Sequence, residues 1–327
     1  MLKKASGIIA FALIPVVLYM VFYFAADGFG FHSLRIIFNQ TLIPLVIGYG
    51  MAFTMAGGLW DLSVGGQVVL AGVVGGLLSR TMGPAGLVIG CIATGLVCSL
   101  ITGLVYRLAK IPSIVVSIGM IMIFEVVARM LAGSGASVSI PENISVIGSG
   151  VDSYVIVVIT SIIFYLLYYR TRFSCHIKAI GNDESIARNM GIKTDITKMN
   201  AFIISGLFFG IAAIMQICYS GTISAKINMS TMSIVFKPIM GVLIGLQLLS
   251  ALDNMAVNVF IGEFAISMIF TGLIALGMPA ALQDVFLGVF MIAVIGISEN
   301  VLLVKDYLRR LSARRKMKRD SIQNHLA

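Results

Sequence analysis

Residues 7–26, GIIAFALIPVVLYMVFYFAA, and residues 155–169, VIVVITSIIFYLLYY, decide the fold because neither run contains a charged side chain. A bilayer hydrocarbon core about 30 Å thick is crossed by roughly 20 apolar residues in a helix that rises about 1.5 Å per residue. The first run has this length and the second approaches it. Both are too long for the strands of an outer-membrane barrel, and no turn signal interrupts them. The runs therefore predict membrane-spanning helices.

The rest of the chain repeats this unit. Of 327 residues, 59% are hydrophobic and 11% are charged, whereas about a quarter of a soluble domain is charged. We predict an all-α, polytopic membrane protein with about ten transmembrane helices. The predicted spans are 7–26, 37–57, 62–80, 85–107, 112–132, 154–169, 200–219, 235–252, 257–277 and 281–304. Residues 1–304 form one membrane domain, and residues 305–327 form a basic tail.

The first span follows Lys3 and Lys4, as the apolar part of a signal peptide would. No small-residue cleavage pattern follows at residues 27–32, so we predict a retained span. The four cysteines show no spacing typical of metal ligands, and we expect reduced packing residues with no metal and no cofactor. They are Cys91, Cys98, Cys175 and Cys218.

Lysine and arginine are concentrated in two segments, 170–198 and the tail after Val304, whereas the loop Gly133–Ser153 contains neither. Short cytoplasmic loops carry an excess of these residues. We therefore place both termini and residues 170–200 in the cytoplasm. The net charge of +9 is explained by these membrane-flanking residues rather than by nucleic-acid binding. Two cations fall on the outer side in this arrangement, Arg80 and Lys226.

Helices in lipid associate through close packing at small residues. Four Gly-x-x-x-Gly pairs lie inside predicted spans, and we expect them to mark contacts between helices. They are Gly72/Gly76, Gly86/Gly90, Gly206/Gly210 and Gly241/Gly245.

The cytoplasmic segment 170–200 predicts a helix of about two turns. Asn182 is a suitable N-cap, Glu184 and Arg188 form an i,i+4 pair, and Gly191 is a natural terminator. So short a helix is marginal alone in water, so we expect it to dock on another protein.

Gly-Asn-x-x-x-x-Ala-Arg-x-x-Gly-Ile at 181–192 resembles the cytoplasmic loop of permeases of the ribose/branched-chain amino acid ABC importer family. Residues 57–65, GGLWDLSVG, are similar to the family's Gly-Gly-Ile-Asp-Leu-Ser-Val-Gly. In that family the loop contacts the ATPase subunit. The resemblance therefore implies a type II ABC importer-like fold and a set of ATPase-coupling residues. These are Gly181, Asn182, Glu184, Ala187, Arg188 and Gly191.

The resemblance implies an importer permease in a bacterial plasma membrane, with a monosaccharide-type solute and nucleosides, autoinducer-like sugars or branched-chain amino acids as rivals. Its expected partners are a separate ATPase, an extracytoplasmic solute-binding protein, a second permease subunit and membrane lipid. The chain itself has no P-loop, which fits an ATPase on another subunit.

Residues 244–253 depart from the family, since this turn has lost most of the usual glycines and the arginine. We therefore hypothesise that this permease pairs with a different permease subunit rather than with itself.

Polar residues inside the spans need a reason, because lipid does not solvate them. Asp61 either caps the third span with Ser63 or faces the pathway at a broken helix. We expect Glu125 to pair with Arg129, and Glu263 to snorkel or to pair across helices. The pathway candidates are Trp60, Asp61, Ser63, Asn39 and Gln40.

Two other classes of function remain as alternatives. A stand-alone secondary transporter or channel is the first, although all three histidines lie outside the spans and no proton-relay chain is visible. A membrane-embedded enzyme is the second, but no HExxH or GxSxG motif occurs.

Overall fold

The computed structural model describes residues 15–26, 28–145, 150–250 and 252–279, with scattered positions between 282 and 296. The chain forms two compact units, residues 1–278 and 279–327, and the first is described below. Of the predicted first span, the structure describes the helix Pro15–Ala25. Most of the predicted tenth span and the whole tail lie outside the described residues.

Seven helices in the described part of the chain are long and apolar enough to cross a membrane. They are α2 (Phe31–Ala56), α3 (Val64–Ala109), α4 (Ser113–Ala132), α6 (Val151–Arg170), α9 (Thr194–Ser220), α10 (Ser233–Gln247, whose span begins at Ser230) and α11 (Met255–Ala275). Each coincides with a predicted span, and α3 covers two. The all-α membrane fold is thereby confirmed, while the count of ten stays a prediction.

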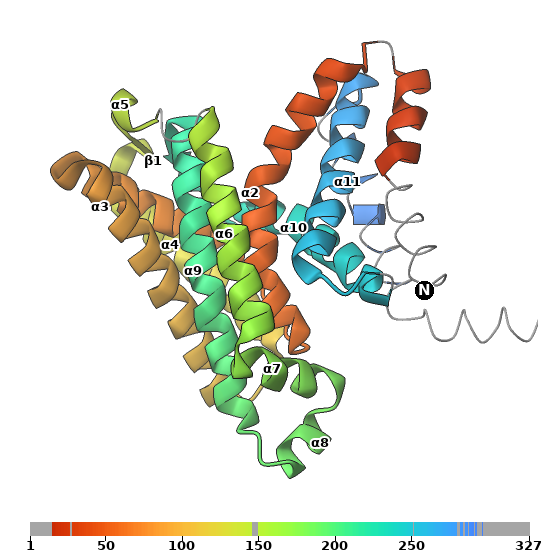
Figure 1. The fold of residues 1–327 in the computed structure, drawn as a ribbon. Coiled ribbons are helices and arrows are strands. Elements are labelled where there is room, and N and C mark those ends of the chain that lie inside the picture. Colours follow the sequence, from red (N-terminus) through yellow and green to blue (C-terminus); the bar gives the residue numbers. More distant parts are fainter. Residues whose placement is uncertain are drawn as a thin grey trace, which may run out of the picture. The chain divides into compact units, whose positions relative to one another are not determined.

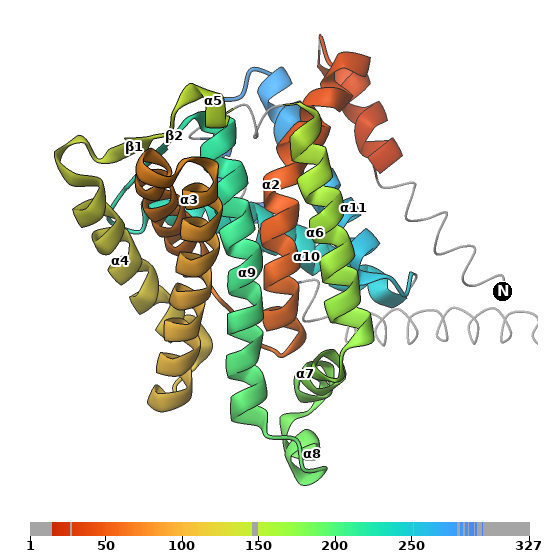
Figure 2. The same cartoon turned by 60° about the vertical axis from the view of Figure 1, so that its left-hand side comes forward.

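Short elements lie at the two ends of these helices (Figure 1). One end carries η1 (Gly133–Gly135), β1 (Ser137–Ser139), α5 (Glu142–Ser145) and β2 (Thr222–Ser224), and β1 pairs antiparallel with β2. The other end carries α7 (Arg172–Asn182) and α8 (Glu184–Asn189), as Figure 2 shows. The remaining short elements are η3 (Ser230–Met232) and η4 (Leu248–Ser250).

Helix α3 is a hairpin of two arms rather than one long rod. Gly83 adopts φ 62° and ψ −148°, a conformation that favours glycine, and Pro84 then begins the second arm. A Cβ atom on Gly90 would lie 2.8 Å from the Cα atom of Gly75. In a continuous helix these two residues would be about 22 Å apart. The arms therefore run side by side, and they match the separate predicted spans 62–80 and 85–107.

Residues 57–63 form a turn followed by a non-helical stretch between α2 and α3. Gly57 and Gly58 turn the chain at the end of α2, and Gly58 has φ +71°. The chain then returns between the helices without helical structure, so that Gln67 bonds to Ser99 on the second arm. Gln67 and Ser99 are equally far from Gly83 in sequence, so the start of the first arm lies level with Ser99. The second arm continues beyond this level to Ala109. The first arm thus begins well inside the helix layer, where its irregular backbone is enclosed by protein.

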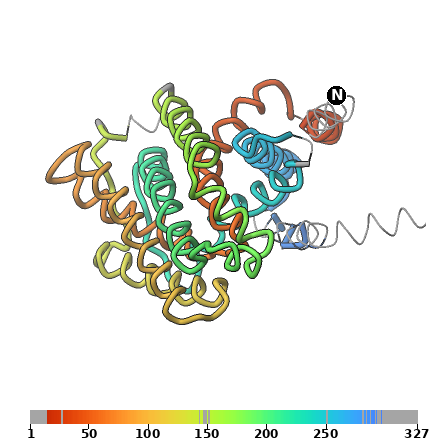
Figure 3. Tube along the Cα trace, turned by 60° about the horizontal axis from the view of Figure 1, so that its bottom comes forward, coloured from red at the N-terminus to blue at the C-terminus, as the bar shows by residue number. Residues whose placement is uncertain are grey.

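Helix α9 lies against α3 on one side and α2 on the other (Figure 3). A Cβ atom on Gly95 of α3 would lie 2.5 Å from the carbonyl oxygen of Gly206 and 2.9 Å from the Cα atom of Gly210. Backbone therefore meets backbone at this contact. Dispersion forces are strongest where atoms approach this closely, which compensates for the missing hydrophobic drive in lipid.

The other predicted glycine pairs are also close contacts. Gly86 and Gly90 face the first arm of α3, and Gly241 and Gly245 face α11. In the remaining pair, Gly76 packs against Ile217 of α9, whereas Gly72 packs against Ile223 of strand β2 rather than against a helix.

The predicted Glu125–Arg129 ion pair is wrong. The Glu125 carboxylate instead accepts hydrogen bonds from the backbone N–H groups of Met229 and Thr231, both at 2.8 Å, and from the Thr231 hydroxyl at 2.6 Å. These N–H groups lie at the start of η3 and α10, where no helical partner exists for them. A negative charge is also favourable at this end of a helix. Arg129 is left exposed.

Glu263 does not snorkel, because its side chain is fully buried beside Gly48 and Gly241. Neither of its carboxylate oxygens has a hydrogen-bond partner among the described residues.

The α3–α9 contact predicts a selective effect of adding a side chain. Gly95→Leu should lower the melting temperature in detergent by about 5 °C or more, because overpacking a close contact costs about 1–3 kcal/mol. Gly119→Leu on α4 is the matched control, since a Cβ atom there meets nothing within 4 Å. Equal melting temperatures for the two variants, measured by intrinsic fluorescence, would contradict this packing.

Candidate functional site

The segment expected to hold one short helix forms two. Helix α7 begins after Thr171, whose hydroxyl accepts a hydrogen bond from the Ser174 N–H group at 3.3 Å. Ile177 and Ile180 are buried, and Phe173 packs against them. Sequence analysis missed α7, although the spacing of these three apolar residues by four and three positions is typical of an amphipathic helix.

Asp183, rather than Asn182, caps α8. Its Oδ1 atom accepts hydrogen bonds from the N–H groups of Ser185 at 2.9 Å and Ile186 at 3.0 Å. Asn182 cannot serve as the cap because it is the last residue of α7. The hydrogen bonds from the Ile186 backbone and then from the Ser185 hydroxyl lower the pKa of Asp183 below its ordinary value.

The end of α8 agrees with the prediction for Gly191. This residue has φ +86°, its N–H group donates to the Arg188 carbonyl, and the Ile192 N–H group donates to the Ala187 carbonyl. These two hydrogen bonds form a Schellman motif, which needs a residue with positive φ at this position. Ala187 lies on the buried face of α8 and is 2% exposed.

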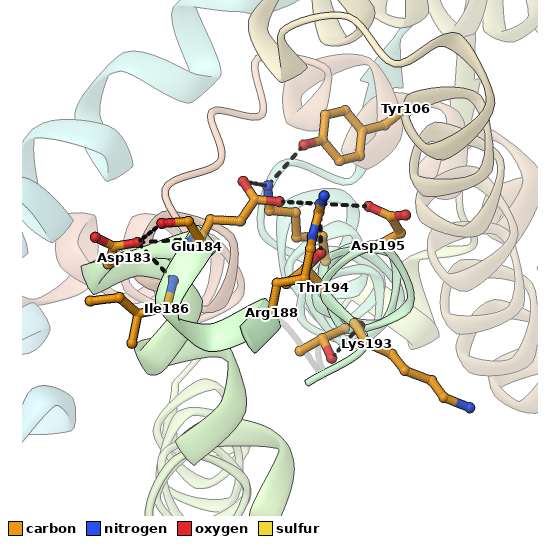
Figure 4. A network of polar contacts seen from close by, with 11 residues as sticks. Tyr106, Asp183, Glu184, Ile186, Arg188, Lys193, Thr194 and Asp195 are labelled. Carbon is orange, nitrogen blue, oxygen red and sulfur yellow. Dashed lines mark hydrogen bonds and ion pairs between the residues drawn. The ribbon is translucent and has the colours of Figure 1, made fainter. Parts of the chain in front are cut away.

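A polar network holds α8 onto α9 (Figure 4). The Glu184 carboxylate accepts a hydrogen bond from Lys198 Nζ at 2.6 Å and from Arg188 Nη2 at 3.3 Å. Arg188 also donates to the Thr194 hydroxyl at 3.1 Å, and Lys198 donates to the Tyr106 hydroxyl at 3.4 Å. The hydrogen bond and charge of Lys198 lower the pKa of Glu184. The predicted Glu184–Arg188 pair is confirmed, and it is part of a larger network.

The two sequence motifs meet at the end of α2. A Cβ atom on Gly181 would collide with the carbonyl oxygen of Ala56, and one on Gly57 would lie 2.5 Å from Ile177 Cδ1. Gly181 therefore has to be glycine for α7 to pack this closely on α2, and Gly57 leaves room for the Ile177 side chain. Asn182 borders a hollow of about 300 Å³ beside this contact.

The outer face of α8 is apolar in part. Ile186 is 57% exposed and Met190, directly after the helix, is 78% exposed. Glu184 and Arg188 bond to other residues of the chain, whereas these two exposed apolar side chains are available to contact another protein. Sequence analysis did not select them, although both lie within the motif 181–192.

The pathway candidates Asp61 and Ser63 lie in a buried cluster with Gln67 and Ser99. Asp61 Oδ1 accepts from the Ser63 N–H group at 2.9 Å and from its hydroxyl at 2.6 Å, and Gln67 Nε2 donates to Asp61 Oδ2 at 3.3 Å. All four residues are 0% exposed. This geometry supports the helix-start interpretation of Asp61, although Ser63 is the N-cap residue itself. Trp60 is next to Asp61 in the chain, and its backbone N–H group donates to the Ser113 hydroxyl at 2.9 Å.

Asn39 and Gln40 lie toward the other end of α2, far from that cluster. Asn39 Oδ1 accepts from the Tyr154 hydroxyl of α6 at 2.6 Å, and Gln40 Oε1 accepts from the Thr271 hydroxyl of α11 at 3.2 Å. The five pathway candidates thus form two separate groups. Among the described residues, no group of three or more histidine, cysteine, aspartate or glutamate side chains is arranged to hold a metal ion.

Residues 33–295 match the model of the family described as the permease component of the branched-chain amino acid transport system. The chain belongs to this permease family. It is 28% identical over 281 residues to the galactofuranose transporter permease protein YtfT of Escherichia coli (strain K12), covering 82% of this chain and 80% of that protein. It is 24% identical over 298 residues to the autoinducer 2 import system permease protein LsrC of Salmonella typhi, covering 88% and 84%. No solved structure matches the chain.

Family membership establishes the class of activity. The chain is a permease subunit of an ABC importer and a multi-pass inner-membrane protein, and it is not an enzyme. ATP hydrolysis takes place in a separate ATPase subunit, and a solute-binding protein is the other partner that the family implies.

The network around Glu184 predicts how firmly α8 is held. Lys198→Met keeps the length of the side chain but removes the charge, so backbone amides of residues 184–189 should exchange hydrogen about fivefold faster. That factor corresponds to the loss of about 1 kcal/mol from one partly exposed charged hydrogen bond. Mass spectrometry after hydrogen exchange measures it. Lys193→Met is the control, because the exposed Lys193 forms no ion pair with any described residue. Similar exchange in both variants would show that Glu184 does not hold α8.

Proposed function

We propose that this chain forms the translocation pathway for a small polar solute, a monosaccharide or a similar compound, and that a separate ATPase drives it through α7 and α8. The names of the relatives support a sugar-like solute, since galactofuranose and autoinducer 2 appear in them. Nucleosides and branched-chain amino acids remain the rival solutes. The observation that carries the coupling role is the pair of exposed apolar side chains on α8 and directly after it. The helix pair is attached to two spans, because α7 packs against α2 and α8 bonds to α9.

Attachment to the spans is what makes this helix pair suitable for transmitting force. Glu184 ties α8 to Lys198 of α9 at 2.6 Å, and Gly181 places α7 directly against the last residue of α2. A displacement of α8 by a partner would therefore be passed to both spans. In this proposal Glu184, Ala187, Arg188 and Gly191 position the helix, while Ile186 and Met190 contact the ATPase.

The pathway candidates also divide into residues that contact the solute and residues that hold a helix in position. Asn39 and Gln40 keep partly accessible amides, so we retain them as residues that contact the solute. Asp61 and Ser63 are enclosed within one subunit and hold the start of α3 in place. Trp60 is assigned to neither group, because its side chain is half-buried and lies in the non-helical stretch.

A second permease subunit completes the proposed transporter, with both termini of this chain in the cytoplasm. The altered turn at residues 244–253 favours a non-identical second subunit.

Replacing the exposed apolar pair tests the coupling role. Ile186→Ser/Met190→Ser should reduce both solute uptake and solute-stimulated ATP hydrolysis about tenfold, because interface hot spots of this kind contribute about 1–2 kcal/mol or more. The measurement uses proteoliposomes that contain the permease, its ATPase and the binding protein. The amount of permease in the membrane should not change.

The control variant is Met130→Ser. It removes a side chain that is 75% exposed near the C-terminal end of α4, away from α7 and α8. Full coupling in Ile186→Ser/Met190→Ser would exclude this face as the contact. Uptake that proceeds without any ATPase would favour a stand-alone transporter or channel instead.

A further inference from the structure

A second feature lies beside the coupling helices and has no role in the function proposed above. A pocket of about 550 Å³ is bounded by the end of α3, the turn between α3 and α4, and α8 with the start of α9. We call it the basic pocket, because four of its lining residues are cations, Arg107, Lys110, Arg188 and Lys198.

The charges of the basic pocket are not balanced by the protein. Its two carboxylates belong to Glu184 and Asp195. Glu184 is already bonded to Lys198 and Arg188, and Asp195 lies 3.9 Å from Arg188. Arg107 and Lys110 form no ion pair with any residue that the structure describes. The pocket therefore has two cations available for an external anion.

Local geometry brings hydrogen-bond donors to the same place. The Tyr106 hydroxyl accepts from Lys198, so its own hydrogen stays available for donation. Lys110 ends α3 in the left-handed region with φ 55°, a position usually occupied by glycine. Unlike a glycine at this position, Lys110 adds a cationic side chain to the pocket. These donors, one neutral and several charged, suit the oxygen atoms of a phosphate group.

The surroundings of the pocket favour a lipid over a free anion as its ligand. Ile111 lines the pocket and is 42% exposed, Leu108 next to Arg107 is 71% exposed, and Val115 in the first turn of α4 is 53% exposed. These side chains belong to the ends of two membrane spans. Apolar surface for acyl chains thus adjoins a cationic pocket, and basic pockets between helices on the cytoplasmic side are suited to anionic head groups.

We propose that the basic pocket binds the phosphate head group of an anionic phospholipid of the cytoplasmic leaflet. The head group would bridge Arg107 and Lys110 at the end of α3 to Arg188 on α8. Bound lipid would then add a third attachment for α8, next to its contacts with α7 and α9. The site is separate from the solute pathway, so it holds whichever solute the transporter carries.

Native mass spectrometry of the full-length permease in detergent tests this site, with phosphatidylglycerol, phosphatidylcholine and inorganic phosphate as probes. The wild-type protein should retain phosphatidylglycerol at least about tenfold more strongly than phosphatidylcholine. Arg107→Gln/Lys110→Gln should weaken phosphatidylglycerol binding about tenfold or more, since each cation near an anionic head group contributes about 1 kcal/mol. Arg129→Gln/Lys226→Gln is the matched control, because it removes one exposed arginine and one exposed lysine elsewhere.

Equal retention of the two lipids by the wild-type protein would overturn the proposal, and this comparison needs no variant to fold. Unchanged phosphatidylglycerol binding in Arg107→Gln/Lys110→Gln, or an equal loss in the control, would also overturn it. Displacement of phosphatidylglycerol by inorganic phosphate at equal concentration would show that a free anion, rather than a lipid, is the ligand.

Discussion

The contact between α7 and the end of α2 is the constraint on which the rest of this structure depends. It exists because Gly181 has no Cβ atom, which lets the backbone of α7 lie directly against Ala56 and Gly57 at the end of α2. The close approach accompanies burial of Ile177 and Ile180 of α7, and removal of these side chains from water also stabilises the contact. A similarly close approach recurs where Gly95 meets Gly206 and Gly210 between α3 and α9. The helix pair at this end is thus built into the membrane domain rather than suspended from it.

This attachment gives the two sequence motifs a common physical meaning. The motif at 57–65 turns the chain after α2 and returns it to the buried Asp61 cluster, and the motif at 181–192 forms α8 and its ends. Because Gly57 and Gly181 lie at one contact, a displacement at α8 reaches the start of α3 through few intermediate residues. We infer that the coupling surface consists of apolar side chains on α8, while its charged residues hold the helix in position.

Much of this was predictable from sequence because the bilayer imposes a length and a composition on every span. The uncharged runs located the helices, and glycine spacing located their contacts, as Gly206 and Gly210 illustrate. The errors concern long-range partners. Glu125 bonds to backbone more than a hundred residues away, and local spacing alone favoured Arg129. Helix α7 was missed because its polar face resembles a loop, and Asn182 was taken as the cap because the end of α7 was unknown. Sequence analysis also missed Lys198 as a partner of Glu184, because this partner too lies beyond the local spacing of one helix.

The proposed coupling role requires α7 and α8 to lie in the cytosol, where an ATPase reaches them. Cys175 on α7 tests this directly, since it is exposed while Cys91, Cys98 and Cys218 are buried. A membrane-impermeant maleimide applied to the otherwise unmodified permease should label Cys175 in inside-out vesicles and leave it unlabelled in intact cells. Labelling of Cys175 from outside intact cells would contradict the account.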